Sequence, residues 1–477
     1  MGTVAFCFLS LDVGGLLSAG AAFRAKTVCS GVFVSSRTLQ AIDEQEFDSR
    51  DDPMSAVLLA LLRTEVDSKA GLVVVSDVLR DLFGLLPSGT WQGLGVSRAA
   101  LHRGALLGCS LLPRAWRRGQ ETPVKPPRGA ATEPAWEWPV AARETPGLAE
   151  VLEKHWREGD GAERPVKKTR AIVVAHRGEI VAERYADSQG FGRETPQLGW
   201  SVTKTLLGAL VGARLANASS GLPGLDEPVN AQVPEWKGLP FQVTLRDLML
   251  MESGLDFEDE YSITGAVVRM LFNSDDAAHF AASRPFKARP GQLFAYSSGV
   301  TNILSRLLRG SFADAAEYLH FPLRALFAPL GMRSAVMETD AAGHFVGSSF
   351  SYATPRDYAK FGQLLLQKGA WKDPLTGELR QIVPQSFVEF MATPGHVNNT
   401  YGGQTWLNIT HTTHPVPTPV SAGTVMVASG HDCQMIAIVP QHQLVVVRLG
   451  FTKKQHRACQ TADLLSELLA VLAHQKY

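Results

Sequence analysis

The stretch Trp200-Ser201-Val202-Thr203-Lys204-Thr205-Leu206-Leu207 carries the strongest chemical signal in this chain. Ser201 and Lys204 are three residues apart, so a helix places both side chains on one face. Serine needs such a neighbour because its free hydroxyl is a weak nucleophile, and a Ser-Lys pair is one known solution. The residues that follow are apolar, which predicts a buried helix and a lowered pKa for Lys204. The same spacing also arises by chance, so an ordinary buried helix remains the alternative.

Two later segments offer side chains that complement this pair. Tyr296, in the stretch 294–302, follows a Pro-Gly turn, and a tyrosine beside a lysine ammonium is expected to ionise more easily and to shuttle a proton. The stretch 428–434 contains His431 and is predicted to end a strand that supplies a backbone N–H to an oxyanion hole. Taken singly, a core tyrosine and a turn with a solvated histidine are the alternatives.

The hydrophobic pattern places strands at both ends of the second part of the chain. A region of helical patterns, about 200–395, separates them, and a final helix is predicted over 457–474. These features predict one antiparallel sheet built from both ends of a mixed α/β domain, with an inserted helical region. The predicted strands are 169–175, 179–185, 423–428, 435–439 and 444–450.

The first 147 residues divide into two predicted segments. Residues 2–23 carry one charge, Asp12, which costs roughly 2.5–3.5 kcal/mol in the centre of a spanning helix. Two alternatives follow for 1–24: a hydrophobic anchor or signal, or a buried or disordered segment. Residues 25–147 form an extension that ends in a Pro-rich strap, and 148–477 form the compact domain. Within the extension, 54–62 is predicted as a helix and 71–85 as a strand followed by a helix.

Composition excludes several classes of protein. Lys+Arg and Asp+Glu both number 46, so no net charge attracts nucleic acid, and membrane contact is expected only through an N-terminal anchor. Apolar residues make up 45%, which argues against disorder. The 5 cysteines are too few and too scattered for a disulfide framework. The sequence leaves the compartment and the oligomeric state open.

In this order, the three motifs resemble those of the serine β-lactamase-like hydrolases. The likeness is greatest to the class C-related branch that includes esterases and 6-aminohexanoate-dimer hydrolase. It covers about 148–475 and implies a β-lactamase/transpeptidase-like fold. The chain lacks the S-D-N and K-T-G motifs of β-lactamases, so a true β-lactamase is not expected. Further similar segments are 244–256, 327–332, 347–364 and 401–408.

The resemblance also implies a role for each matching residue. Ser201 would be the acylated nucleophile, with Lys204 as its proton partner and Tyr296 as general base and acid. The remaining roles fall to Ser298, which would contact Lys204 or substrate, to His431, at the position of the K-T-G lysine, and to the N–H groups of Ser201 and Gln434, which would form the oxyanion hole.

The chain departs from the family pattern at Cys433, where relatives usually carry glycine. A cysteine side chain there either crowds the approach of the strand to substrate or points away. Two segments, 23–37 and 97–109, also resemble an extension found in some of these hydrolases. On that resemblance a Cys29–Cys109 disulfide is a hypothesis, and two buried free thiols are the alternative.

These observations predict a serine hydrolase that cleaves a small ester or amide through an acyl-enzyme on Ser201. The alternatives are a catalytically impaired or silent binding or scaffold protein with the same fold, and a penicillin-binding D-aminopeptidase or transpeptidase. No cofactor is required. No metal is expected either, because His411 and His414 lie in a Thr/Pro-rich stretch that is not helical.

Overall fold

The computed structural model describes ten segments of the chain, and the account below is confined to them. They are residues 13–47, 61–78, 96–120, 138–142, 145–156, 167–262, 264–372, 376–408, 424–452 and 460–473.

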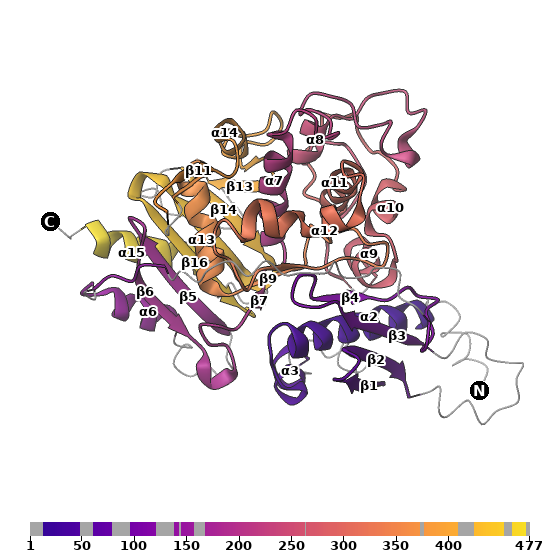
Figure 1. Cartoon of the computed structure of the whole chain (residues 1–477), viewed down its shortest axis with the longest axis horizontal. Coiled ribbons are helices and arrows are strands. Elements are labelled where there is room, and N and C mark those ends of the chain that lie inside the picture. The colour runs from indigo at the N-terminus through magenta and orange to yellow at the C-terminus, as the bar shows by residue number, and fades with distance from the viewer. Residues whose placement is uncertain are drawn as a thin grey trace, which may run out of the picture.

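A seven-stranded antiparallel sheet forms the centre of the domain, with strand order β12-β13-β14-β15-β16-β5-β6 (Figure 1). The hairpin of β5 and β6 comes from the start of the domain and pairs with β16 from its end, so both ends of the domain build one sheet, as predicted. Arg177 and Gly178 form the hairpin turn with φ of 53° and 85°. The strands are β5 (Thr169–His176), β6 (Glu179–Tyr185), β12 (Tyr401–Gly402), β13 (Thr405–Asn408), β14 (Val425–Gly430), β15 (Gln434–Val439) and β16 (Leu444–Gly450).

Helices cover both faces of this sheet, because successive strand residues point to opposite sides. Ile172 and Val174 of β5 face α6 (Leu148–Trp156) and α15 (Thr461–Ala473), whereas Ala171 and Val173 belong to the larger core on the other face. That second core contains α7 (Val202–Leu215) and α13 (Pro355–Leu366). The predicted final helix is therefore confirmed, although its described part begins at Thr461.

The inserted region is mainly helical, as predicted, and lies above one end of the sheet in Figure 1. Three short strands in it form a separate sheet in the order β7-β9-β8. The helices are α8 (Leu245–Met249), α9 (Ala266–Asn273), α10 (Ala277–Ala282), α11 (Ser298–Gly310), α12 (Ala315–Pro322) and α14 (Gln385–Met391), and the strands are β7 (Gln197–Leu198), β8 (Val336–Met337) and β9 (Ser351–Ala353), with a small hairpin of β10 (Ala370–Lys372) and β11 (Leu379–Gln381).

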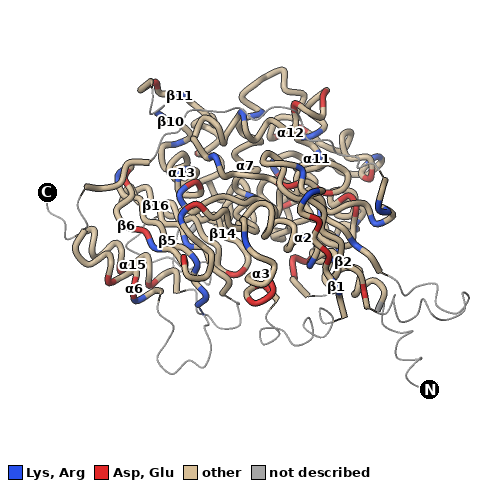
Figure 2. Tube along the Cα trace, turned by 60° about the horizontal axis from the view of Figure 1, so that its bottom comes forward, with Lys and Arg blue, Asp and Glu red and all other residues tan. Residues whose placement is uncertain are grey.

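The N-terminal extension is a folded layer against the helical region. Helix α2 (Val13–Phe33) packs along a four-stranded sheet and against α9 (Figures 1 and 2). The predicted boundary at residues 24 and 25 falls inside α2, whose Ala21, Ala22 and Ala25 are fully buried. No helix among the described residues combines the length and the apolarity needed to cross a bilayer. The elements are α3 (Leu39–Glu46), β1 (Leu62–Asp67), β2 (Leu72–Asp77), β3 (Ser97–His102) and β4 (Cys109–Leu111).

The strand predicted within 71–85 is β2. The predicted helix at 54–62 lies outside the described residues except for Leu61, in a turn, and Leu62, which starts β1, so these two residues are not helical. The helix predicted after β2 and residues 121–137 of the strap also lie outside the described residues.

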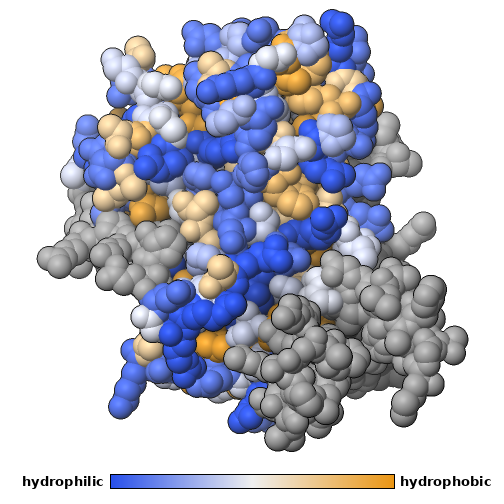
Figure 3. Space-filling model, turned by 90° about the vertical axis from the view of Figure 1, so that its right-hand side faces the viewer, coloured by the Kyte–Doolittle hydropathy of each residue, from blue (hydrophilic) through white to orange (hydrophobic). Residues whose placement is uncertain are grey.

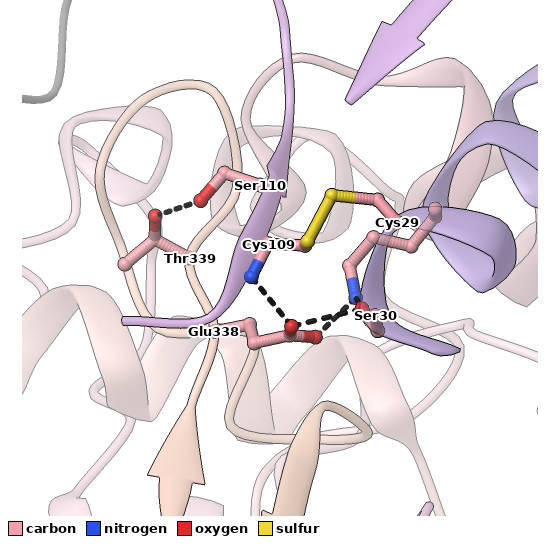
Figure 4. Close-up of a disulfide and its surroundings, with 7 residues drawn as sticks. Cys29, Ser30, Cys109, Ser110, Glu338 and Thr339 are labelled. Atoms are coloured by element: carbon pink, nitrogen blue, oxygen red, sulfur yellow. Dashed lines mark hydrogen bonds and ion pairs between the residues drawn. A yellow bond between two sulfur atoms is a disulfide. The ribbon is translucent and has the colours of Figure 1, made fainter. Parts of the chain in front are cut away.

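A buried ion pair and a disulfide anchor the extension (Figure 4). Cys29 of α2 is bonded to Cys109 of β4, so the hypothesised pairing is confirmed. Lys26 of α2 pairs with Glu338, which also accepts hydrogen bonds from Ser30 Oγ (2.9 Å) and from the backbone N–H of Cys109 (2.6 Å). Burial lowers the pKa of Lys26 and raises that of Glu338, because each charge has lost its hydration.

The Lys26→Met variant is expected to lower stability by about 3–5 kcal/mol, because it leaves the Glu338 carboxylate buried without its partner. Urea unfolding measures the change. The double variant Lys26→Met/Glu338→Gln keeps an acceptor for Ser30 and Cys109 but removes the charge, so it should recover part of the loss. A double variant no more stable than the single one would contradict this account.

Candidate active site

The segment 197–204 makes a tight turn from β7 into α7, and this turn presents Ser201. Gly199 N–H donates to the carbonyl of Ser351 in β9 (2.9 Å), which fixes the end of β7. Trp200 then adopts a φ of 49°, a strained conformation for a residue with a large side chain. Ser201 is the N-cap of α7, so its backbone lies at the positive end of the helix dipole.

Lys204 is the centre of a hydrogen-bonded cluster. It is 1% exposed, and its Nζ lies 2.8 Å from Ser201 Oγ, 3.0 Å from Ser298 Oγ and 3.0 Å from the carbonyl oxygen of Ser348. Burial lowers the pKa of Lys204 to about 8, while Asp259 opposes the shift. The helix thus places Ser201 and Lys204 together, and burial brings the pKa of the lysine closer to neutral pH.

Ser298 joins Lys204 to an acidic residue that the sequence analysis did not single out. Its Oγ donates to Asp259 Oδ2 (3.1 Å) while it accepts from Lys204. Asp259 Oδ1 is buried and has no hydrogen-bond partner. Ser297, the N-cap of α11, accepts from Val300 N–H (3.1 Å) and so fixes the start of the helix that carries Ser298.

Tyr296 lies beside this cluster but is not ionised more easily, contrary to expectation. Lys204 Nζ lies 4.8 Å from the centroid of its ring. Burial, followed by the nearby Tyr401 and Asp259, raises the pKa of Tyr296 well above its usual value, although a side-chain hydrogen bond with Ser201 opposes the rise. The ring stacks on Trp406 of β13, with centroids 5.1 Å apart. Tyr296 is therefore a neutral phenol in the free protein.

His431 forms an aromatic wall with two residues next to the cluster. Its ring stacks on Tyr261 at 4.4 Å between centroids and meets Trp200 edge-on at 5.6 Å. Burial raises the pKa of Tyr261, as does the charge of Asp259. The structure thus brings His431 close to the turn at 197–204 that presents Ser201, called the nucleophile turn below. Tyr261 is a further neighbour that the sequence analysis missed.

The side chain of Gln434 is hydrogen-bonded to the neighbouring strand β16. Its Nε2 donates to the carbonyl of Gly450 in β16 (2.6 Å), and its Oε1 accepts from Gly450 N–H (3.0 Å). Gly430 instead approaches the nucleophile turn: a β-carbon on it would lie 2.2 Å from the carbonyl oxygen of Gly199.

The turn between β14 and β15 uses backbone conformations that favour glycine. Asp432 and Cys433 have φ of 56° and 68°. The Cys433 sulfur lies 3.6 Å from the carbonyl oxygen of Thr452, and the residue is disulfide-bonded. The cysteine that replaces the family's glycine at 433 thus lies at a strained backbone position. The sulfur of Cys433 faces the Thr452 carbonyl.

The residues missed by the sequence analysis lie in segments that contain no motif with the spacing of catalytic residues. Asp259 and Tyr261 flank Glu260 in an acidic stretch that is typical of a solvated loop, so only the fold identifies them.

One group in the described part of the chain, Asp276, Asp340 and His344, has the composition to hold a metal ion. Asp276 Oδ1 and Asp340 Oδ2 already accept backbone N–H groups, and the group includes none of the cluster residues. His411 and His414 lie outside the described residues.

The comparisons with known proteins agree with this arrangement. The family model Beta-lactamase matches residues 150–469. A Bacillus anthracis protein assigned as a 6-aminohexanoate-dimer hydrolase superposes with a TM-score of 0.54 at 20% identity, over 71% of this chain and 88% of its own. A Bacteroides dorei protein assigned as a beta-lactamase gives 0.52 at 18% identity, over 69% and 98%.

EstCE1, described as a hydrolase with promiscuous acyltransferase activity, gives a TM-score of 0.51 at 16% identity, over 68% of this chain and 98% of its own. These low identities establish the shared fold alone. No curated protein matches the sequence. On the extent of the family match, which covers most of the chain, this protein belongs to the beta-lactamase family.

Proposed function

We propose that the protein is a serine hydrolase that cleaves a small ester or amide through an acyl-enzyme on Ser201. The observation that carries the proposal is the contact of 2.8 Å between Ser201 Oγ and Lys204 Nζ, with burial lowering the pKa of Lys204 to about 8. A catalytic base needs a pKa near the working pH, and the lowered pKa of Lys204 meets this requirement. The family membership supports the same chemistry.

In the proposed reaction, neutral Lys204 takes the proton of Ser201 as Oγ bonds to the substrate carbonyl carbon. Tyr296, protonated in the free protein, gives its proton to the leaving alcohol or amine as the scissile bond breaks. Proton transfer from Lys204 then restores Tyr296. Water cleaves the acyl-enzyme by the reverse sequence and releases the acid, so atoms and protons balance and no cofactor takes part.

The oxyanion would bind to backbone N–H groups at the start of α7 and at the turn after β14. Ser201 supplies the first N–H, as expected from the resemblance. The second is placed on the backbone at Gly430–His431 rather than at Gln434, because Gly430 is the residue that touches the nucleophile turn. Two fixed donors aimed at the developing charge stabilise the transition state.

Intact mass after incubation with a fluorophosphonate probe tests the nucleophile. The native protein is expected to gain one adduct, with loss of fluoride, and Ser201→Ala is expected to gain none. Folded native protein that acquires no adduct would contradict the proposal and favour a silent protein with the same fold. An adduct that persists in Ser201→Ala would assign a different nucleophile.

The rate of labelling should rise with pH and level off above about pH 8, as Lys204 loses its proton. Asp259 raises the pKa of Lys204, so Asp259→Asn should shift the midpoint of this profile to lower pH. Stopped-time labelling across a pH series measures both midpoints. Glu258→Gln, an exposed neighbour, is the matched control and should leave the midpoint unchanged. Equal midpoints for all three proteins would contradict the assignment of Lys204 as the base.

The Gly430→Ala variant should slow labelling by about 100-fold, because its methyl group would force the end of β14 away from the Gly199 carbonyl. Gly310→Ala is the matched control, since a β-carbon there meets no atom within 4 Å. Circular dichroism should show both variants folded. A folded Gly430→Ala variant that labels at the native rate would remove this turn from the oxyanion site.

A further inference from the structure

A buried arginine in the N-terminal extension has unused hydrogen-bonding capacity. Arg98 of β3 is 4% exposed, and its Nη1 donates to the carbonyl of Phe272 (3.0 Å) and contacts Ser18 Oγ and Asn273 Oδ1 (both 3.3 Å). Its Nε and Nη2 are buried and have no partner. A guanidinium has five N–H donors, so much of this group is unsatisfied.

The charge of Arg98 is also not neutralised by an ion pair. No carboxylate among the described residues lies within ion-pair distance of it, and Asp275 only stabilises the charge from farther away. Burial lowers the pKa of Arg98 to about 10, which still leaves it cationic at neutral pH. An uncompensated buried charge is costly, so a fold that keeps one gains if a ligand supplies the opposite charge.

Arg98 lines a cavity of about 1070 Å³ between the extension and α9. Four exposed arginines surround its opening: Arg114, Arg117, Arg118 and Arg269. The five arginines outnumber the two acidic residues in its wall, Glu65, which pairs with Arg118 (2.9 Å), and Asp275, which accepts the backbone N–H of Arg114 (2.9 Å). Positive charge therefore dominates the cavity, and Figure 3, which faces this side of the molecule, shows a strongly hydrophilic band.

Small side chains in the wall account for the volume of the cavity. Gly14, Gly15 and Ser18 of α2 and Ala99 of β3 line the wall, and Trp116 adds an aromatic surface. The volume lies at the upper end of the range for small-molecule sites. The cavity is thus large enough for a ligand of several charged groups.

We propose that this cavity is a binding site for a small polyanion that carries phosphate or carboxylate groups. The planar guanidinium binds two oxygens of either group at once, as the exposed arginines at the opening can, and the buried charge of Arg98 attracts the ligand from the cavity wall. The ligand would neutralise Arg98 at the base of the cavity and engage the exposed arginines at the opening. The proposed hydrolase site plays no part in this binding.

Calorimetric titration of the full chain at fixed ionic strength tests the site, with pyrophosphate and citrate as probes and chloride as the reference anion. The native protein should bind at least one probe at a single site. Binding of pyrophosphate alone would assign a phosphate ligand, binding of citrate alone a carboxylate ligand, and binding of both the shared chemistry. Absence of binding for both probes at millimolar concentration would overturn the proposal.

Arg98→Gln is expected to raise the Kd by about 10- to 100-fold, because the positive charge in the cavity wall is lost. If that variant fails to fold, the exposed double variant Arg114→Gln/Arg269→Gln carries the test and should weaken binding at least several-fold. Arg380→Gln, exposed on β11, is the matched control and should bind as the native protein does. Unchanged binding in the double variant would overturn the site.

Fluorophosphonate labelling of the same variants separates this proposal from the hydrolase. Arg98→Gln and the double variant should label at Ser201 at the rate of the native protein. Loss of anion binding with labelling retained supports a separate site, and loss of both would show that the cavity does not act independently.

Discussion

The contact that organises this molecule is that of the buried Lys204 amine with Ser201 and with two segments distant in sequence. Ser201 comes from its own helix, Ser298 from α11 and the Ser348 carbonyl from the segment before β9. A lysine in this position loses its hydration, so its charged form is only weakly favoured. Every neighbouring oxygen therefore influences whether Lys204 holds its proton. The geometry therefore sets both the position of the nucleophile and the proton affinity of its partner.

The extension is connected to this site through one segment of the helical region. Glu338 receives Lys26 at one end of the segment, and Ser348 meets Lys204 near the other. Two residues after Ser348, Phe350 lies under the Lys26 ammonium at 4.2 Å and close to Trp200 at 6.2 Å between ring centroids. The extension is thus a structural support for the wall behind the nucleophile, and its disulfide holds two of the elements that provide it.

Much of the fold followed from periodicity. Nearly continuous apolar runs in β5 and in β14 to β16 reflect a sheet buried on both faces, and a Gly-containing turn marks the first hairpin. Helix α2 continues across the boundary expected at residues 24 and 25. Local sequence shows the apolar run before that boundary but not the surface on which the run packs. Local sequence does not reveal that a run of alanines is covered by a sheet and by α9.

The sequence by itself determined that Ser201 and Lys204 meet, because a helix fixes the spacing of residues three apart whatever surrounds them. Only the tertiary structure decided the rest of the site. Asp259, Tyr261 and Gly430 reach the cluster from loops and strands far along the chain, and the pKa of Tyr296 follows from the side chains that bury it. The placement of Arg98 has the same origin, since the distant α2 and α9 fold over its strand and remove it from water.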